Sequence, residues 1–262
     1  MIGVWWDKLL LGALNREKVL TVIGRGHSGT RVIASALSAS GVFMGTPLNL
    51  SHDLVPPDRL YQAMRLAGRR VRYKGNYEWD FSGLIQKKPD DAFYRHLRIY
   101  LSRLISRPHH NGYCGWKIPE TLLCFPWMVR LFPRMKYIYW VRDPRDVILG
   151  AHVTDDFGWM AVPFETPEDV MIRRAASWKY QWDLVKATPK PEYFMRVRYE
   201  DFVENPEETL GRLEDFLGMP LARTEVLKTR IGLWRRVRPA QNIPFLTEAL
   251  VELGYESGAP GK

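Results

Sequence analysis

The stretch VLTVIGRGHSGTRVIASALSASGVFMG, residues 19–45, decides the fold. Residues 19–24 form a short apolar run that ends in glycine, and residues 28–38 are rich in small side chains that suit a helix. A strand, a glycine-rich turn and a helix in this order make the front half of a βα unit. The stretch therefore predicts a phosphate-binding loop between the strand and the helix.

The predicted loop differs from a Walker A loop, which places lysine directly after its last glycine. In this chain Thr30 and Arg31 follow Gly29. Glycines still let the backbone approach an anion, and the unpaired N–H groups at the start of the helix point toward it. Ser28 and Thr30 add hydroxyl donors. We therefore expect an anion to bind here without a loop lysine.

Two predicted strands further along the chain each end in a cation. GYCGWK, residues 112–117, ends in Lys117, and MKYIYWVRD, residues 135–143, carries Arg142 near its end. Another strand is predicted at residues 193–201, and helices are predicted between the strands, which indicates a parallel sheet with right-handed crossovers. Ligands of such sheets bind beyond the carboxyl ends of the strands. The loop, Lys117 and Arg142 should therefore meet at one edge.

The other elements complete a three-layer α/β/α fold with a central parallel sheet. A second short strand is predicted at residues 42–44, a loop at 46–57 and a helix at 58–72. Residues 90–107 form an amphipathic helix with a basic outer face, and residues 120–133 form the helix between two strands. A chain of 262 residues with this pattern is expected to be a single domain, with its core at about residues 19–256.

Composition narrows the classes of partner and compartment. The net charge is +9, which favours an anionic partner such as a nucleotide, a nucleic acid, an acidic glycan or a membrane surface. Cys114 and Cys124 are the only cysteines, so a reducing compartment is the simpler expectation. The sequence has neither a metal-ligand spacing nor a long uncharged apolar run. We expect a cytoplasmic protein without a metal or a transmembrane segment.

Five segments, in order, resemble sulfotransferases that use 3′-phosphoadenosine-5′-phosphosulfate (PAPS), including bacterial members. GRGHSGTR resembles their 5′-phosphosulfate loop, GWKIPET the segment that supplies a lysine, and YIYWVRDPRDVILGAHV the strand and helix that bind the 3′-phosphate. VRYEDFVENPEETLGRLEDFLGMP resembles the last strand and helix of the core. IGLWRR, followed by FLTEALVELGYE, resembles the C-terminal cofactor loop and closing helix.

The resemblance implies a P-loop-like sulfotransferase and assigns roles to residues. The enzyme would move a sulfuryl group from PAPS to a hydroxyl or amine and release adenosine 3′,5′-bisphosphate, without magnesium. Lys117 would stabilise the leaving oxygen, and Trp234 would pack on the adenine. The cofactor-binding residues implied are Arg25, Gly26, His27, Ser28, Gly29, Thr30, Arg31, Arg142, Trp234, Arg235 and Arg236.

Two positions depart from the family pattern. His27 stands where the family has arginine or lysine, so a protonated histidine would make catalysis pH-sensitive, unless Arg25, Arg31 or Lys117 supplies the charge. Gly150 stands where the family has a serine on the 3′-phosphate, and Arg235 or Arg236 would have to compensate for the missing hydroxyl.

A hydroxyl acceptor also requires a general base. In relatives with a carboxylate base, that residue often follows the second strand, where this chain has Thr46 and Pro47. The remaining candidates are Asp53 and His52, followed by Glu78, which forms a second candidate pair with Asp80 in NYEWDF. A carbohydrate or lipid-linked glycan hydroxyl is the expected acceptor, from the resemblance to bacterial members.

Two other functions fit parts of the sequence. A P-loop kinase acting on a small molecule shares the fold but requires a loop lysine and a magnesium carboxylate, which are missing where expected. A non-catalytic nucleic-acid-binding protein would account for the positive charge and for the arginine-rich stretch at residues 65–74. The five ordered segments argue against nucleic acid as a partner.

Overall fold

The centre of the protein is a parallel sheet of four strands. The computed structural model describes residues 2–105, 112–224, 231–237 and 243–255. In these residues the sheet has the order β4-β1-β5-β6, and its strands are β1 (Val19–Ile23), β4 (Cys114–Lys117), β5 (Lys136–Val141) and β6 (Phe194–Arg198). The four strands predicted around these positions are thereby confirmed.

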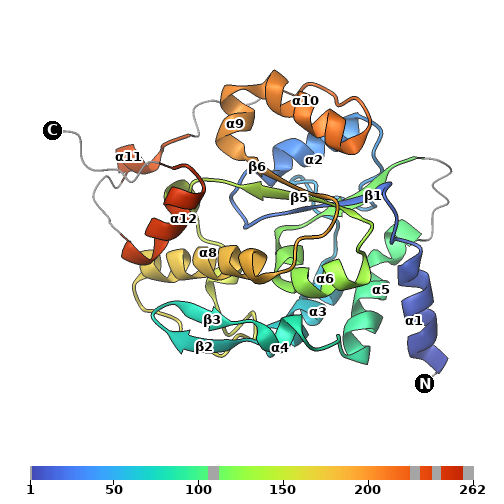
Figure 1. Ribbon diagram of the computed structural model, residues 1–262, viewed down its shortest axis with the longest axis horizontal. Coiled ribbons are helices and arrows are strands. Elements are labelled where there is room, and N and C mark those ends of the chain that lie inside the picture. The colour runs from blue at the N-terminus through green and yellow to red at the C-terminus, as the bar shows by residue number, and fades with distance from the viewer. Residues whose placement is uncertain (1, 106–111, 225–230, 238–242, 256–262) are drawn as a thin grey trace.

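Helices cover both faces of the sheet (Figure 1). One face carries α2 (Thr30–Ala39), α9 (Tyr199–Glu204) and α10 (Pro206–Leu217). The other carries α3 (Asp58–Gly68), α5 (Asp91–Ile105), α6 (Phe125–Leu131) and α8 (Val170–Ala187). Two separate apolar cores lie on the two sides of the sheet. The three-layer α/β/α architecture is thereby confirmed.

The remaining elements are short, apart from one N-terminal helix. They are α1 (Ile2–Gly12), β2 (Arg72–Gly75), β3 (Glu78–Asp80), α4 (Ser82–Ile85), η1 (Pro119–Cys124), α7 (Pro144–Val147), η2 (Val153–Asp155), α11 (Trp234–Val237), η4 (Pro244–Leu246) and α12 (Thr247–Glu252). Strands β2 and β3 pair as an antiparallel hairpin. The sequence reading did not predict α1, this hairpin or the long helix α8.

Several predicted boundaries are wrong. The strand expected at residues 42–44 is reduced to one isolated bridge between Phe43 and Cys114. Residues 199–201 belong to helix α9, because β6 ends at Arg198. The helices expected to reach residues 72 and 107 end at Gly68 and Ile105; residue 107 and the expected core end at residue 256 lie outside the described residues. Residues 120–133 hold a 3-10 turn and a shorter helix.

Strands β1 and β5 are buried along their whole length, because helices cover both of their faces. Lys136 in β5 is buried as well, and its ammonium group donates to the carbonyl oxygens of Phe216 and Leu217 at 2.7 and 2.9 Å. These carbonyls lie at the C-terminal end of α10, where a helix favours a cation. The lysine thus fixes α10 against the sheet.

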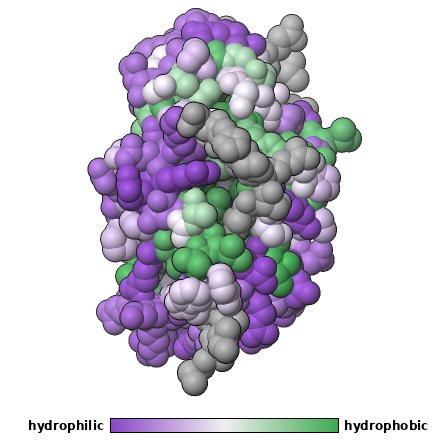
Figure 2. Space-filling model, turned by 90° about the vertical axis from the view of Figure 1, so that its right-hand side faces the viewer, coloured by the Kyte–Doolittle hydropathy of each residue, from purple (hydrophilic) through white to green (hydrophobic). Residues whose placement is uncertain are grey.

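Helix α1 exposes apolar side chains on the face of the molecule that Figure 2 shows. Trp5, Trp6 and Leu9 are each more than half exposed, at 60%, 51% and 52%. The opposite side of α1 packs on α5, where Asp7 forms an ion pair with Arg98. Among the described residues, no helix has the length and apolar character needed to span a bilayer.

Two glycine substitutions should change stability in opposite directions. A Cβ atom on Gly115 would lie 2.3 Å from the carbonyl oxygen of Leu20 in the neighbouring strand, so Gly115→Ala should lower the free energy of unfolding by about 1–3 kcal/mol. Gly211 lies inside α10 with open space around it, so Gly211→Ala should raise this free energy by about 0.5–1 kcal/mol. Urea denaturation measures both; equal effects would contradict the packing described here.

Candidate active site

The glycine-rich loop joins β1 to α2 as the sequence predicts. Gly29 adopts φ 84° and precedes the helix without a side-chain cap. The backbone N–H groups of Gly29, Thr30 and Arg31 have no acceptor among the described residues, because the first N–H groups of a helix lack an intrahelical partner. Ser28 and Thr30 are buried beside them. This arrangement suits an anion.

Lys117 lies next to the loop, at the end of β4, because the parallel register pairs it with Val22 of β1. Its side chain is 2% exposed, and its Nζ atom lies 2.5 Å from Oδ1 of Asp53 and 2.5 Å from the carbonyl oxygen of Ser51. Burial lowers the pKa of Lys117, while Asp53 opposes this shift. The structure thus brings together two residues that were expected to be catalytic.

Arg142 follows β5 on the other side of the loop. Its guanidinium donates to the carbonyl oxygen of His27 at 3.2 Å and to Oδ2 of Asp146 at 3.2 Å. It also lies over the ring of Tyr199, 4.9 Å from the ring centre. Asp146 in turn accepts from the backbone N–H groups of Gly232 and Trp234. The C-terminal segment at residues 231–236 is therefore tied to Arg142 through one carboxylate.

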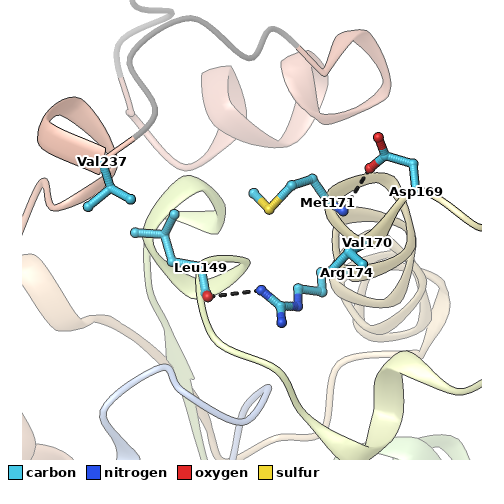
Figure 3. Close-up of a pocket in the computed structure, with 6 residues that line it drawn as sticks. All are labelled: Leu149, Asp169, Val170, Met171, Arg174 and Val237. Atoms are coloured by element: carbon cyan, nitrogen blue, oxygen red, sulfur yellow. Dashed lines mark hydrogen bonds between the residues drawn. The ribbon is translucent and has the colours of Figure 1, made fainter.

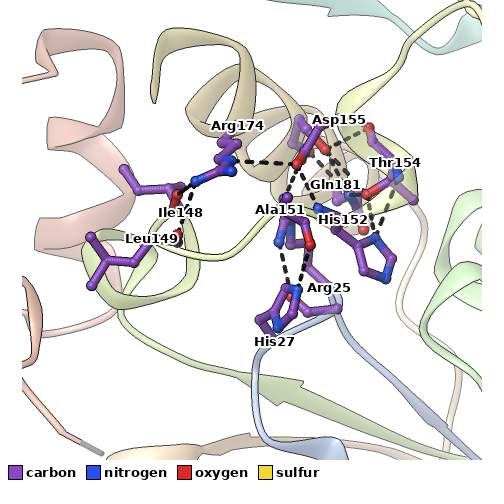
Figure 4. Close-up of polar contacts among 12 residues, drawn as sticks. Arg25, His27, Ile148, Leu149, Ala151, His152, Thr154, Asp155, Arg174 and Gln181 are labelled. Atoms are coloured by element: carbon purple, nitrogen blue, oxygen red, sulfur yellow. Dashed lines mark hydrogen bonds and ion pairs between the residues drawn. The ribbon is translucent and has the colours of Figure 1, made fainter. Parts of the chain in front are cut away.

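Arg25 lies in the loop, but its guanidinium is occupied by other groups (Figure 4). It forms a buried ion pair with Asp155 and donates to the carbonyl oxygen of Gly26 at 3.0 Å. Arg174 lies 3.8 Å from the same carboxylate and donates to the carbonyl oxygens of Ile148 and Leu149. These contacts connect the loop to residues 148–155. Arg25 therefore holds the loop in place, which is a structural role in addition to the expected binding of the cofactor.

His27 and Gly150, the two departures from the family pattern, face each other. The Nε2 atom of His27 lies 2.6 Å from the carbonyl oxygen of Ala151, so Nε2 carries the proton and donates. A Cβ atom on Gly150 would lie 3.1 Å from the His27 ring. A larger residue at position 150 would therefore push the His27 ring away, which couples the two positions.

The three candidate bases lie in different surroundings. Asp53 pairs with Lys117 and also accepts from the side-chain amide of Asn49 at 3.0 Å. His52 is half-buried with φ 59°, and its Nδ1 atom has no partner among the described residues. Glu78 is exposed on the β2–β3 hairpin, where it lies 3.8 Å from Lys74. Of these three candidate bases, Asp53 is the one that contacts Lys117, the candidate that would stabilise the leaving oxygen.

The C-terminal residues expected at the nucleotide lie beside Arg142. The guanidinium of Arg145 lies 4.0 Å from the centre of the Trp234 ring, and that of Arg235 lies 4.9 Å from it. Trp234 therefore already stacks on cations, and its indole N–H has no partner among the described residues. Arg31, Arg235 and Arg236 are exposed.

A cavity of about 390 Å³ opens near this segment (Figure 3). It lies between the end of α7, the start of α8 and α11, and it is lined by Leu149, Asp169, Val170, Met171, Arg174 and Val237. Its volume falls in the range of small-molecule pockets. The described residues contain no cluster of His, Cys, Asp or Glu that could hold a metal ion.

The sequence reading missed Glu120 and His152, which lie at the centre of the site. Glu120, on η1, is 4% exposed, and its Oε1 atom lies 3.5 Å from the Tyr61 hydroxyl and 3.7 Å from Nε2 of His152. The His152 ring packs against Gly26, where a Cβ atom would lie 2.1 Å from Nε2. A lone acid within the apolar stretch IPETLLCF was the available signal for Glu120; His152 had none.

The pKa of Glu120 is raised from 4.5 to about 7, because burial and the charge of Asp53 raise it by more than Lys117 and Tyr61 lower it. Burial also lowers the pKa of His152 to about 3, together with the charges of Arg25 and His27. His152 is therefore neutral near pH 7. At that pH both the charged and the neutral form of Glu120 are populated.

The shifted pKa of Glu120 predicts a pH-dependent stability difference. Between pH 4.5 and 7 the folded protein keeps a proton that the unfolded chain has lost, so the wild type loses stability as the pH rises through this range. Glu120→Gln lacks this group and should gain about 3 kcal/mol relative to the wild type over the same range, with no further gain above it. Urea denaturation at several pH values measures the difference. Glu78→Gln is the control, and a constant offset for Glu120→Gln would contradict the shift.

Comparison with known proteins identifies the family. Residues 20–223 match the model of a sulfotransferase family. A relative from Caenorhabditis briggsae, named as a candidate protein-tyrosine sulfotransferase, is 26% identical over 208 residues, which cover 78% of this chain and 67% of that protein.

Two solved structures share the fold at low identity. The sulfotransferase domain of the curacin biosynthetic pathway has a TM-score of 0.56 at 16% identity and covers 92% of this chain and 99% of that one. The sulfotransferase domain of the Synechococcus PCC 7002 olefin synthase also has a TM-score of 0.56, at 14% identity, with 94% and 97% covered. The family match extends over most of the chain, and the chain therefore belongs to the sulfotransferase family, whose activity is the transfer of sulfuryl groups.

Proposed function

We propose that this protein transfers a sulfuryl group from PAPS to an acceptor hydroxyl and releases adenosine 3′,5′-bisphosphate. One observation carries the proposal: the ends of the adjacent strands β4, β1 and β5 bring Lys117, the glycine-rich loop and Arg142 together. A donor with two separated anionic groups fits a site with cations on both sides of an anion-binding loop. Family membership supports a sulfuryl donor over a phosphoryl donor.

In this proposal the loop amides hold the 5′-phosphosulfate and Arg142 binds the 3′-phosphate. The planar guanidinium suits a phosphate because it donates two parallel hydrogen bonds. The 390 Å³ cavity beside Leu149 and Val237 has room for part of a nucleotide, and the segment carrying Trp234 borders it. Arg235 and Arg236 lie exposed on the same segment and can reach an anion.

The reaction forms one bond to sulfur and breaks another. The acceptor oxygen bonds to sulfur, the bond from sulfur to the bridging oxygen breaks, and that oxygen leaves as part of the phosphate. The ammonium group of Lys117 stabilises the negative charge that develops on the leaving oxygen. His27, held by the carbonyl oxygen of Ala151, is the second cationic candidate beside the loop.

The relatives suggest two classes of acceptor. The name of the nematode relative suggests a tyrosine hydroxyl, and the resemblance to bacterial members suggests a glycan hydroxyl. A screen with PAPS against tyrosine peptides, glycans and simple alcohols, with mass detection of the added sulfate, identifies the class.

Equilibrium titration tests the proposed donor. The wild type should bind adenosine 3′,5′-bisphosphate more tightly than ATP, and a random oligonucleotide should bind weakly with a steep salt dependence. Tighter binding of ATP with magnesium would favour a kinase. Tight oligonucleotide binding without binding of the bisphosphate would favour a nucleic-acid-binding protein.

Arg142→Ala should weaken the binding of adenosine 3′,5′-bisphosphate by about 2 to 4 kcal/mol, because a charge-assisted pair of hydrogen bonds is lost. Calorimetry with adenosine 5′-phosphosulfate, which lacks the 3′-phosphate, should show little change. Arg142→Lys keeps the charge and should lose part of the affinity, and Arg212→Ala on α10 is the exposed control. If both ligands lose the same binding free energy, Arg142 does not bind the 3′-phosphate.

Lys117→Met should keep the bisphosphate bound within about threefold and lower kcat by about a hundredfold or more, because the lysine acts on charge that develops in the transition state. Steady-state turnover with PAPS and calorimetry measure the two effects. Lys74→Met removes an exposed lysine of the hairpin and should leave both values unchanged. Normal turnover with weakened binding would make Lys117 a binding residue only.

A further inference from the structure

We propose that Glu120 is the general base that takes the proton from the acceptor hydroxyl. The proposal rests on the function proposed above. It assigns the role to a residue outside the candidates that the sequence suggested. Glu120 is buried on η1, three residues after Lys117, and its Oε2 atom has no hydrogen-bond partner among the described residues. A buried carboxylate oxygen without a partner is costly, and a substrate hydroxyl would satisfy it.

The other carboxylates near the loop are already occupied. Both oxygens of Asp53 are engaged, one by the ammonium group of Lys117 at 2.5 Å and the other by the amide of Asn49 at 3.0 Å. Asp146 is bound to Arg142 and to two backbone N–H groups, and Asp155 is bound to Arg25. Among the carboxylates described around the loop, Glu120 is the one with an oxygen that no other group occupies, and this oxygen is available for the proton of the acceptor.

His152 positions the Glu120 carboxylate against the loop. The Thr154 hydroxyl lies 2.9 Å from Nδ1 of His152, and its oxygen also accepts from the Gln181 amide at 3.1 Å. The Thr154 hydroxyl therefore donates to Nδ1, and the backbone N–H of Thr154 points at the same atom. The imidazole proton is thus on Nε2, which lies 3.7 Å from Oε1 of Glu120 and packs on Gly26. A neutral N–H group therefore lies beside Oε1 of Glu120, and Oε2 is left to the acceptor.

The charges around Glu120 suit a base. Four polar groups face Glu120: Tyr61 on α3, His152 beside η2, Lys117 on β4 and Asp53 in the loop before α3. The buried hydroxyl of Tyr100 on α5 is close enough for the charge of Glu120 to raise its pKa. Burial raises the pKa of Glu120 to about 7, and a base works best when its pKa lies near the working pH. The neighbouring side chains of Asp53 and His152 are 17% and 16% exposed, so Glu120 lies beside side chains that reach the surface.

The proton balance of the step is simple. The acceptor O–H bond breaks, its proton bonds to Oε2 of Glu120, and the electron pair of that bond forms the new oxygen–sulfur bond. The bridging bond breaks with its electron pair on the leaving phosphate oxygen, which the Lys117 ammonium stabilises. Glu120 returns the proton to solvent after the products leave.

The test compares Glu120→Gln with Asp53→Asn and with the exposed control Glu208→Gln. Two readouts are used: calorimetric binding of adenosine 3′,5′-bisphosphate, and kcat against pH for conversion of PAPS with the acceptor found in the screen, or with water. Glu120→Gln should bind the bisphosphate within threefold of the wild type and lose kcat by about a hundredfold or more at pH 7.5. The wild-type decline of kcat below about pH 7 should disappear in Glu120→Gln and remain in Asp53→Asn.

A conservative variant and a position control complete the test. Glu120→Asp keeps a carboxylate and should recover part of kcat together with the acid limb of the profile. Glu208→Gln changes an exposed glutamate on α10 and should match the wild type. His152→Gln keeps an amide N–H near the carboxylate and should shift this limb, with a smaller loss of kcat than Glu120→Gln.

The outcomes separate the two proposals. A wild type that does not bind the bisphosphate overturns the proposed donor. A wild type that binds it and turns over PAPS, with Glu120→Gln equally active or with the acid limb lost in Asp53→Asn instead, overturns only the role of Glu120. In the latter case Asp53 is the base.

Discussion

The site depends on the pairing of buried cations with carboxylates at the carboxyl edge of the sheet. Lys117 pairs with Asp53, Arg142 with Asp146 and Arg25 with Asp155, and all three cations are nearly buried. A buried charge without a partner is very unfavourable. Each pair therefore fixes a loop or segment that would otherwise be free to move: residues 51–53, 231–234 and 150–155.

These pairs also set the conditions for binding an anion. A donor that approaches Lys117 or Arg142 has to share the cation with its carboxylate, because the ion pair already exists in the protein. Such sharing keeps the cation charged and oriented before the donor binds, which lowers the reorganisation needed in the reaction. Arg25 differs because its carboxylate also lies near Arg174, so its pair serves the connection between the loop and residues 148–155.

The contact between His27 and Gly150 shows how two unusual residues depend on each other. His27 has φ 69°, and its imidazole donates to the carbonyl oxygen of Ala151. This position of the ring requires the small residue at 150, because a Cβ atom there would lie 3.1 Å from the ring. The glycine at position 150 and the histidine at position 27 therefore depend on each other, because the ring of one occupies the space beside the other.

The sequence by itself determined the sheet, its phosphate-type loop and two of the cations at its edge. Apolar strands that alternate with helices leave few arrangements, and in a parallel sheet Lys117 and Arg142 must fall at the same edge as the loop. Local pattern was weaker at residues 42–44, where three apolar residues made only one bridge, and at residues 199–201, where a helix began earlier than expected. Only the tertiary structure decided which carboxylate keeps an oxygen atom without a hydrogen-bond partner among the described residues. The sequence put Asp53 forward as a base and did not single out Glu120, but the fold places Lys117 on Asp53 and leaves Glu120 buried beside His152. Hydrogen bonding and burial at a site depend on residues far apart in the chain, and spacing along the sequence does not encode them.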